Sequence, residues 1–373
     1  MNYAQHMDRE YQKELCYLYW DIFNIQELIA LSPSTTHPTA IQYSSFVLCI
    51  ITCIIGFTSN ITVIFVTGFL MRKNKSQIWF LNLALADFTF LLFLPLYAVS
   101  VITAGWPYGS SMCKLYFFFS FLNMYAGIYI LTALNIDRAL SVAKPIWHRN
   151  FFSRKFSYGI CSLIWVLSVL CSIPAMIYSE VHYINGPQCL LFPNDLSGIV
   201  YYNNDQNSNE SQSWRSLPRN LCDEPFENSE MFQEWMEIFS TTTGLVVSLA
   251  VIGCVIPLCV ILFSNIIIVL HVKNSQKTSS SKLYRVVTAA VLAFFSTRTP
   301  LVLAQIIYLV AVYTLRFTLM YKVIASLPLL SSIAAINTFL NPVVYVLVGK
   351  QVRNEISQVF GKLQMQHTPF PCT

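Results

Sequence analysis

Seven long apolar segments recur along this chain of 373 residues, and they restrict its possible folds more than any other feature. Each is long enough to cross the hydrocarbon core of a bilayer, which takes about 20 apolar residues in a helix. Because backbone polar groups find no water in that core, each segment must satisfy its own hydrogen bonds as a helix. The sequence therefore predicts an all-α membrane protein, a seven-transmembrane helix bundle. The expected spans are 43–70, 77–103, 111–141, 157–178, 239–271, 284–312 and 321–348.

The composition excludes most other classes of protein. The chain is 55% hydrophobic and only 11% charged, whereas about a quarter of the residues in a soluble domain are charged. The sequence contains no metal-ligand cluster, nucleophile triad or phosphate-binding glycine loop, so we expect neither an enzyme nor a nucleic-acid partner. A transporter is the strongest rival class by composition. An odd number of spans without an inverted repeat argues against it.

Basic residues in the connecting segments predict the orientation of the chain. Lys and Arg gather after the first, third, fifth and seventh spans, and by the positive-inside rule these four segments face the cytosol. Residues 1–42 then form an extracellular arm, 43–348 the bundle, and 179–238 a long second extracellular loop, with 349–373 in the cytoplasm. The basic residues are Arg72, Lys73, Lys75, Lys144, Arg149, Arg154, Lys155, Lys273, Lys277, Lys282, Arg285, Lys350, Arg353 and Lys362.

Acidic residues have the opposite distribution, and the net charge of +5 conceals it. Five lie in the amino-terminal arm between Asp8 and Glu27, and more lie between Glu180 and Glu237. An acidic outer face would attract a cationic ligand such as a basic peptide or protein. The alternative is that these acids only keep a long loop hydrated.

Four cysteines are expected on the oxidising outer side, where disulfides form. They are Cys16, Cys113, Cys189 and Cys222. A bridge from Cys113 to Cys189 would tie the second outer loop across the top of the bundle, and Cys222 is the alternative partner for Cys113. Cys16 and Cys222 would form a second pair if Cys189 takes Cys113.

Two further features lie outside the spans. Asn209-Glu210-Ser211 is the one glycosylation sequon expected on the outer side, whereas the sequon at Asn74 is cytosolic. After the seventh span, Val352, Ile356, Val359 and Phe360 recur at helical spacing with Lys and Arg interleaved, so residues 350–362 predict a short amphipathic helix on the inner leaflet. Serines and threonines are more frequent in the third inner loop than in the tail, so arrestin binding through the tail is only a secondary expectation.

Ionisable residues within spans are costly, and each is a functional candidate. They are Asp87, Asp137, Arg138 and Arg298. Asp137 and Arg138 are adjacent at the end of the third span, where a structural ion pair would be the simplest interpretation. The surrounding motifs change that interpretation.

These motifs occur in a fixed order along the spans. They are Asn60, Leu83-Ala84-Leu85-Ala86-Asp87, Cys113, Asp137-Arg138, Trp165, Pro174, Pro257, Pro300 and Asn341-Pro342-Val343-Val344-Tyr345. In this order the chain resembles the rhodopsin-like family of G-protein-coupled receptors over residues 43–360. Trp106-Pro107-Tyr108-Gly109 and Lys144-Pro145-Ile146-Trp147 resemble its chemoattractant branch, which includes formyl-peptide, complement-anaphylatoxin, chemerin and chemoattractant prostaglandin D2 receptors. Phe121-Leu122-Asn123-Met124 and Val346-Leu347 are similar to the prostaglandin member.

The resemblance implies a mechanism and a set of sites. An extracellular peptide or lipid ligand would bind among the outer helix ends, the sixth span would swing outward at Pro300, and a heterotrimeric G protein, usually of the inhibitory class, would bind near Arg138. Asp137, Asn341, Pro342 and Tyr345 would take part in this activation. Asp87, Asn123, Asn337 and Asn341 would resemble the family's sodium and water pocket. The alternative for these four residues is a set of interhelical hydrogen bonds.

Four positions depart from the family pattern, and they put sodium binding and coupling in doubt. The chain has Ala139 in place of a tyrosine after Asp137-Arg138, Asn265 in place of a tyrosine in the fifth span, and Gly127 in place of a serine of the sodium site. Arg298 replaces the tryptophan of the sixth span. These changes leave open a decoy or scavenging receptor without G-protein coupling.

Arg298 should have an anionic partner, because an unpaired guanidinium in the middle of a span would cost several kcal/mol. It could reach inward toward Asp87 and act as a built-in cation in place of sodium, or upward to a ligand carboxylate. Helical periodicity places further residues on the inward face of the outer bundle. The expected ligand pocket is Ser120, Phe121, Met124, Arg298, Gln305 and Tyr308.

Overall fold

The computed structural model describes residues 38–70, 76–183, 186–191, 230–273, 280–314 and 316–348. Within these residues seven helical spans are long and apolar enough to cross a membrane. Their ends lie within a few residues of the expected ones, so the prediction of a seven-helix bundle is confirmed. The spans are Ala40–Phe69, Gln77–Thr103, Gly109–Ala143, Arg154–Ile177, Ser240–His271, Val287–Tyr313 and Thr318–Val343.

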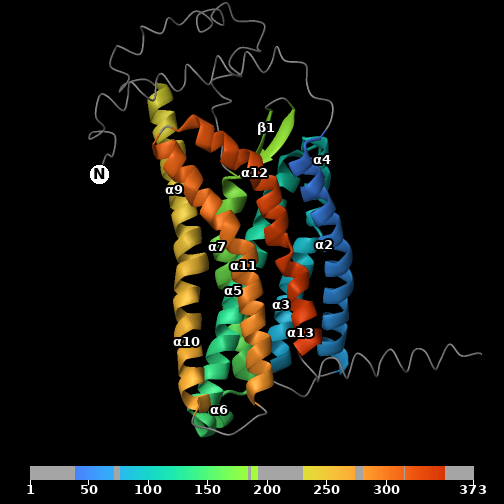
Figure 1. Cartoon of the computed structure of the whole chain (residues 1–373), viewed down its shortest axis with the longest axis vertical. Coiled ribbons are helices and arrows are strands. Elements are labelled where there is room, and N and C mark those ends of the chain that lie inside the picture. The colour runs from blue at the N-terminus through green and yellow to red at the C-terminus, as the bar shows by residue number, and fades with distance from the viewer. Residues whose placement is uncertain are drawn as a thin grey trace, which may run out of the picture.

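The spans run side by side as one elongated bundle (Figure 1). Four of them are built from more than one helix. The helices are α2 (Ala40–Phe65), the π-helix η2 (Val66–Leu70), α3 (Ser76–Leu91), α4 (Leu94–Thr103), α5 (Gly109–Ala143), α6 (Pro145–Phe151), α7 (Arg154–Ile177), α9 (Glu230–Ala250), the π-helix η6 (Val251–Val255), α10 (Ile256–Lys273), α11 (Ser280–Tyr313), α12 (Phe317–Ala335) and α13 (Asn337–Val348).

In two spans the helix interruption lies next to a proline, which lacks a backbone N–H donor. In the second span α4 begins at Leu94, and Pro95 occupies its first turn. In the fifth span the π-helix η6 precedes Pro257, so the widened turn lies where the proline removes a regular hydrogen bond. In the seventh span α12 ends at Ala335 and α13 contains Pro342.

The two ends of the bundle differ in structure. At one end β1 (Glu180–Tyr183) and β2 (Pro187–Leu190) form an antiparallel hairpin with Val181 opposite Cys189. We call this the hairpin end. The short helix α6 lies at the opposite end, which we call the α6 end (Figure 1).

A disulfide anchors the hairpin to the bundle. Cys189 of β2 is bonded to Cys113 in the first turns of α5, with the two Cα atoms 5.5 Å apart. The backbone N–H of Trp106 donates to the carbonyl of Pro187 over 2.6 Å, and the Trp106 side chain is buried. The preferred Cys113–Cys189 pairing is therefore present. Cys16 and Cys222, the second pair, lie outside the described residues.

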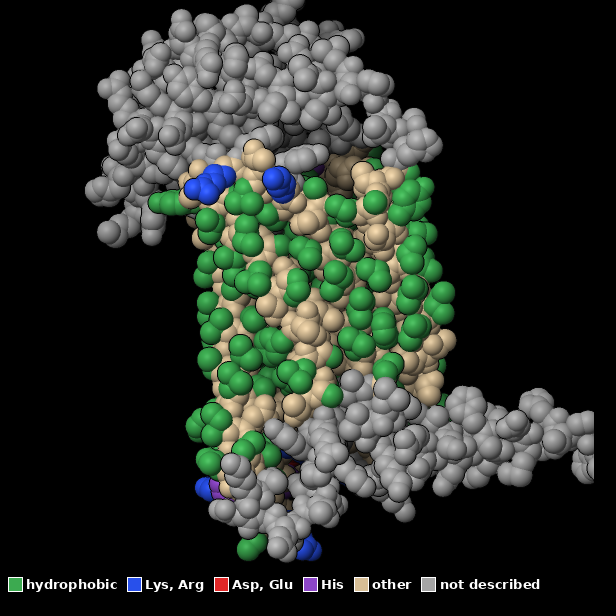
Figure 2. Space-filling view, viewed as in Figure 1, with side chains coloured by type: hydrophobic (Ala, Val, Ile, Leu, Met, Phe, Trp, Pro, Cys, Tyr) green, Lys and Arg blue, Asp and Glu red, His purple; other side chains and the backbone are tan. Residues whose placement is uncertain are grey.

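The outer surface of the bundle is apolar along its length. On the face shown in Figure 2, hydrophobic side chains cover the helices, and Lys and Arg lie near the two ends. On α7, Leu163, Val166 and Leu170 are exposed, whereas Ser168 and Ser172 are buried. The small residues face the neighbouring helix and the large ones face outward, as expected where the surroundings are lipid.

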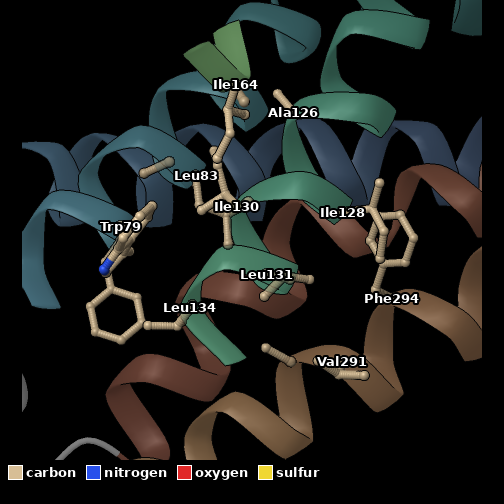
Figure 3. Packing of buried hydrophobic residues seen from close by; sticks show 14 of the residues in the cluster. Trp79, Leu83, Ala126, Ile128, Ile130, Leu131, Leu134, Ile164, Val291 and Phe294 are labelled. Carbon is tan, nitrogen blue, oxygen red and sulfur yellow. The ribbon is translucent and has the colours of Figure 1, made fainter. Parts of the chain in front are cut away.

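The core lies between α3, α5 and α11. Trp79 and Leu83 of α3 are buried with Leu134 of α5, and Ile128 of α5 packs beside the ring of Phe294 of α11 (Figure 3). Close packing of these rigid side chains fixes the separation of the three helices. The polar side chains of the same helices are thereby held in one interior cluster.

Candidate functional site

A buried polar network joins four helices in the middle of the bundle. Asp87 of α3 lies at its centre and is fully buried. Asn123 of α5 donates from Nδ2 to Asp87 Oδ1 over 2.7 Å, and Asn341 of α13 donates from Nδ2 to Asp87 Oδ2 over 3.0 Å. Each carboxylate oxygen therefore accepts a hydrogen bond, as a buried charged group requires.

Arg298 of α11 completes the network. Its Nη2 donates to Asn123 Oδ1 over 2.9 Å, and the side chain is buried. Among the described residues, Arg298 forms no ion pair within 4.0 Å. The amide of Asn123 thus lies between the guanidinium and the carboxylate, accepting from Arg298 and donating to Asp87. Of the two orientations expected for Arg298, the structure has the inward one, with Asn123 as the intermediate.

A second asparagine links the first and seventh spans. Asn60 of α2 donates from Nδ2 to the carbonyl of Thr338 over 2.8 Å and to that of Gly56 over 2.9 Å. Pro342, four residues after Thr338, has no N–H to donate to that carbonyl. The Asn60 amide supplies the missing donor, which explains why an amide side chain is buried at this position.

The network does not fit a sodium ion as it is arranged. A hard cation needs several oxygen ligands that are free to turn toward it. Asn337 Oδ1 and Asn341 Oδ1 accept no hydrogen bond from the described residues. Both Asp87 oxygens and Asn123 Oδ1, however, already accept one each, and the Arg298 guanidinium adds a positive charge to the cluster, which disfavours a second cation. Gly127 lies beside Phe294 and Leu83. Because glycine has no side chain, it supplies no oxygen where the family has a serine.

Some polar atoms of the network have no partner. Arg298 Nε and Asn341 Oδ1 are buried without a hydrogen bond, and so is Asn337 Oδ1, one turn before Asn341 in α13. Buried polar groups without partners are costly.

The second polar cluster lies at the α6 end. Asp137 Oδ2 accepts from Nη2 of Arg138, and Asp137 Oδ1 lies 2.8 Å from Nε2 of His148 in α6. The Asp137–Arg138 pair was expected from the sequence, whereas His148 was not. Its sequence signal is weak, because a histidine in the last turn of a short helix usually interacts with the helix C-terminus.

The expected ligand-pocket residues lie in different surroundings. Ser120 and Phe121 of α5 and Gln305 and Tyr308 of α11 are half-buried. Met124 is a buried member of the core. Their role in ligand binding stays a prediction.

Two aromatic residues near the hairpin end, Tyr97 and Tyr116, were not singled out from the sequence, whereas Trp106 belongs to a motif noted there. The ring of Tyr116 stacks on that of Tyr97 with centroids 5.2 Å apart, and Trp106 lies 5.9 Å from Tyr116. This cluster closes the space between α4 and α5 beneath the hairpin. Aromatic residues are common throughout this chain, so their sequence positions alone did not distinguish the cluster.

Some predicted features lie outside the described residues. They are the sequon at Asn209, Cys222 and Cys16, the expected amphipathic helix at 350–362, and the side chain of Tyr345.

Comparison with known proteins gives consistent matches along the bundle. Residues 59–345 match the model of the 7 transmembrane receptor (rhodopsin family). Chemerin-like receptor 1 of Sus scrofa is 28% identical over 84% of this chain and 79% of its own. The C3a anaphylatoxin chemotactic receptor of Oncorhynchus mykiss is 29% identical over 93% of this chain and 84% of its own. The C5a anaphylatoxin chemotactic receptor 1 of Canis lupus familiaris is 26% identical over 86% of this chain and 79% of its own.

Proposed function

Because the chain belongs to the rhodopsin family of seven-transmembrane receptors, we propose that it is a plasma-membrane receptor for an extracellular peptide or protein chemoattractant, coupled to inhibitory-class heterotrimeric G proteins. The observation that carries this proposal is the match along most of the chain to receptors named for chemerin, C3a and C5a. The family is one of receptors and not of enzymes. The choice of the inhibitory class follows the chemoattractant branch that the sequence resembles.

The environment of Arg298 supports a peptide rather than a carboxylate lipid as the ligand. A lipid carboxylate would need a guanidinium that points toward the hairpin end of the bundle. Arg298 instead donates to Asn123, with 8% of its surface exposed. The acidic residues between Glu180 and Glu237 favour a cationic ligand, since opposite charges raise the rate of encounter.

Receptor activation would be a shift between two arrangements of the helices. A ligand can favour the active arrangement only if it binds that arrangement more tightly than the resting one. The polar network crosses α3, α5, α11 and α13, so movement of α11 about Pro300 would change the Arg298–Asn123 contact. Ligand contacts near the hairpin end would thereby be coupled to the α6 end, where the G protein would bind beside Arg138.

Arg298 would serve as the built-in cation of the network in place of sodium. Its positive charge lies one hydrogen-bonded amide away from Asp87. A tethered cation does not dissociate, so its effect on the resting arrangement would not depend on the sodium concentration. The basal state of this receptor would then be insensitive to sodium.

The proposal is tested by measuring nucleotide exchange on purified heterotrimers in membranes that contain the full chain. Chemerin, C3a and C5a peptides, formyl peptides and prostaglandin D2 are applied, and membranes without the receptor serve as the control. We expect a peptide of this group to raise exchange on the inhibitory class. A response to the prostaglandin alone would contradict the proposed ligand class.

A decoy receptor is the second candidate, and two residues favour it. Ala139 is buried where the family has a tyrosine, and Asn265 Oδ1 in α10 is buried without a partner where another family tyrosine would stand. Saturable binding of a labelled peptide without exchange on any heterotrimer class would identify a decoy. Binding accompanied by exchange would exclude it.

A further inference from the structure

The carboxylate of Asp137 is held from two sides, and one of its partners comes from outside α5. Asp137 Oδ2 accepts from Arg138, and Oδ1 lies 2.8 Å from His148 Nε2. An ionised carboxylate can only accept hydrogen bonds, so Nε2 of His148 carries the proton and donates it. The side chains of Asp137 and His148 are only 6% and 15% exposed, which shields the bond from competing water.

Packing sets the orientation of the His148 ring independently of this bond. α6 begins at Pro145, whose fixed φ suits the first turn of a helix. The His148 ring stacks on that of Phe152, with centroids 4.8 Å apart and an interplanar angle of 19°, and Phe152 is buried. The donor is therefore already aimed before it meets Asp137.

The contact with His148 complements the Asp137–Arg138 pair. Adjacent residues on a helix do not face each other, so the two side chains meet only if the carboxylate is turned toward Arg138. The hydrogen bond from His148 to Oδ1 is compatible with that orientation and leaves Oδ2 for the guanidinium.

We propose that His148 is a positioning residue that holds the Asp137 carboxylate in the orientation in which it restrains Arg138. This inference rests on the G-protein coupling proposed above. Because His148 belongs to α6, a partner that displaces α6 at this end of the bundle would release Asp137 and, with it, Arg138. Through His148, binding of a partner to α6 would thereby free the Arg138 side chain from Asp137.

Three substitutions separate the hydrogen bond from the packing and the charge. His148→Phe keeps a ring that can stack on Phe152 and removes the donor. His148→Gln places an amide N–H near the position of Nε2 and removes the ring. Arg149→Gln is the matched control, because Arg149 is an exposed residue of the same helix.

The first measurement requires no G protein. The full chain is labelled with ¹⁵N-histidine in lipid nanodiscs, and the His148 signals among those of the 6 histidines are assigned with His148→Gln. We expect Asp137→Asn to shift the His148 ring signals and Arg149→Gln to leave them unchanged. Unchanged His148 signals in Asp137→Asn would overturn the inference.

The second measurement is ligand-independent nucleotide exchange per surface-expressed receptor. His148→Phe should raise it about five- to tenfold, which corresponds to the loss of about 1 kcal/mol, the net contribution of one typical hydrogen bond. His148→Gln should return most of the way to the wild-type rate, and Arg149→Gln should match the wild type. If the wild type supports exchange, equal rates for His148→Phe and Arg149→Gln would also overturn the inference.

The two measurements distinguish the failure of this inference from failure of the coupling itself. If the His148 signals respond to Asp137→Asn but no variant and no ligand gives exchange on any heterotrimer class, the positioning contact stands and the proposed coupling is wrong. If the wild type supports exchange and the signals do not respond, the coupling stands and the role of His148 is wrong.

Discussion

At the scale of single residues, Arg298 occupies a costly environment within the bundle. It lies near the middle of the span Val287–Tyr313, where a guanidinium is far from water. Its charge is tolerated because Asn123 connects it to Asp87 through two hydrogen bonds. A buried charge that loses its partner is more costly than the absence of both charges. Removing either Arg298 or Asp87 alone should therefore destabilise the receptor more than removing both.

Replacing Arg298 by glutamine should lower the stability of the receptor. Arg298→Gln leaves the buried Asp87 carboxylate without a nearby cation, and we expect a loss of about 3 kcal/mol. A second substitution, Asp87→Asn, should recover most of this loss because it removes the remaining charge. The measurement is the thermal unfolding temperature of the detergent-solubilised receptor, with the exposed Arg316→Gln as a control for loss of a positive charge.

The same variant tests the sodium hypothesis. When NaCl replaces KCl, the unfolding temperature of the wild type should stay the same, whereas that of Arg298→Gln should rise because a sodium ion can then approach Asp87. Equal sodium dependence in both proteins would contradict the role of Arg298 as a built-in cation. Equal unfolding temperatures for Arg298→Gln and Arg316→Gln would also contradict that role.

At the scale of helices, the sequence predicted the spans well and their interruptions poorly. The ends of the spans follow from the apolar segments, since the length of a span is set by the thickness of the bilayer. The π-helix η6 depends on how the turn before Pro257 redistributes its hydrogen bonds, which hydrophobicity does not encode. The contact of His148 with Asp137 spans 11 residues and depends on the angle between α5 and α6, so sequence spacing alone did not reveal it.

The close packing of η6 against α5 predicts that Gly253 does not tolerate a larger residue. A Cβ atom at Gly253 would lie 3.2 Å from Tyr125 Cε1 and 3.3 Å from Met124 Cε. Gly253→Ala should therefore destabilise the receptor by about 1 kcal/mol through overpacking. At Gly159 of α7 a Cβ atom would meet nothing within 4 Å, so Gly159→Ala should be neutral or stabilising. The unfolding temperature of Gly253→Ala should be lower than that of Gly159→Ala. The reverse result would refute the close contact at Gly253.

The disulfide predicts different effects for two cysteines of the second outer loop. Cys189→Ser opens the bridge to Cys113, which joins residues 76 positions apart, and should cost about 2–4 kcal/mol. Cys222→Ser should leave this bridge intact. Peptide mapping without reduction identifies the bridge, and unfolding temperatures measure its contribution. A Cys113–Cys222 peptide in the wild type would show that the hairpin is not anchored as described.

At the scale of the whole molecule, the distribution of charge around an apolar bundle defines how the receptor sits in a membrane. On the face shown in Figure 2, the surface between the two ends is largely hydrophobic and Lys and Arg lie near the ends. Basic residues of α6 and its flanks, including Lys144 and Arg149, lie at the α6 end, where they would face the anionic cytoplasmic leaflet. The acidic residues of the expected outer loop follow the hairpin in the sequence. We therefore expect the hairpin end to lie outside the cell.

Glycosylation tests this orientation, because the transferase acts only on the lumenal side of the membrane. The chain carries one sequon at Asn209 in the expected outer loop and another at Asn74 in the expected first inner loop. Asn209→Gln should abolish the shift in electrophoretic mobility that deglycosylation produces, and Asn74→Gln should leave it unchanged. Antibodies to an amino-terminal tag should stain intact cells, and antibodies to a carboxyl-terminal tag should stain only permeabilised ones. Loss of the glycan in Asn74→Gln, together with staining of the carboxyl-terminal tag on intact cells, would mean that the α6 end faces outward and that Arg138 lies out of reach of a G protein.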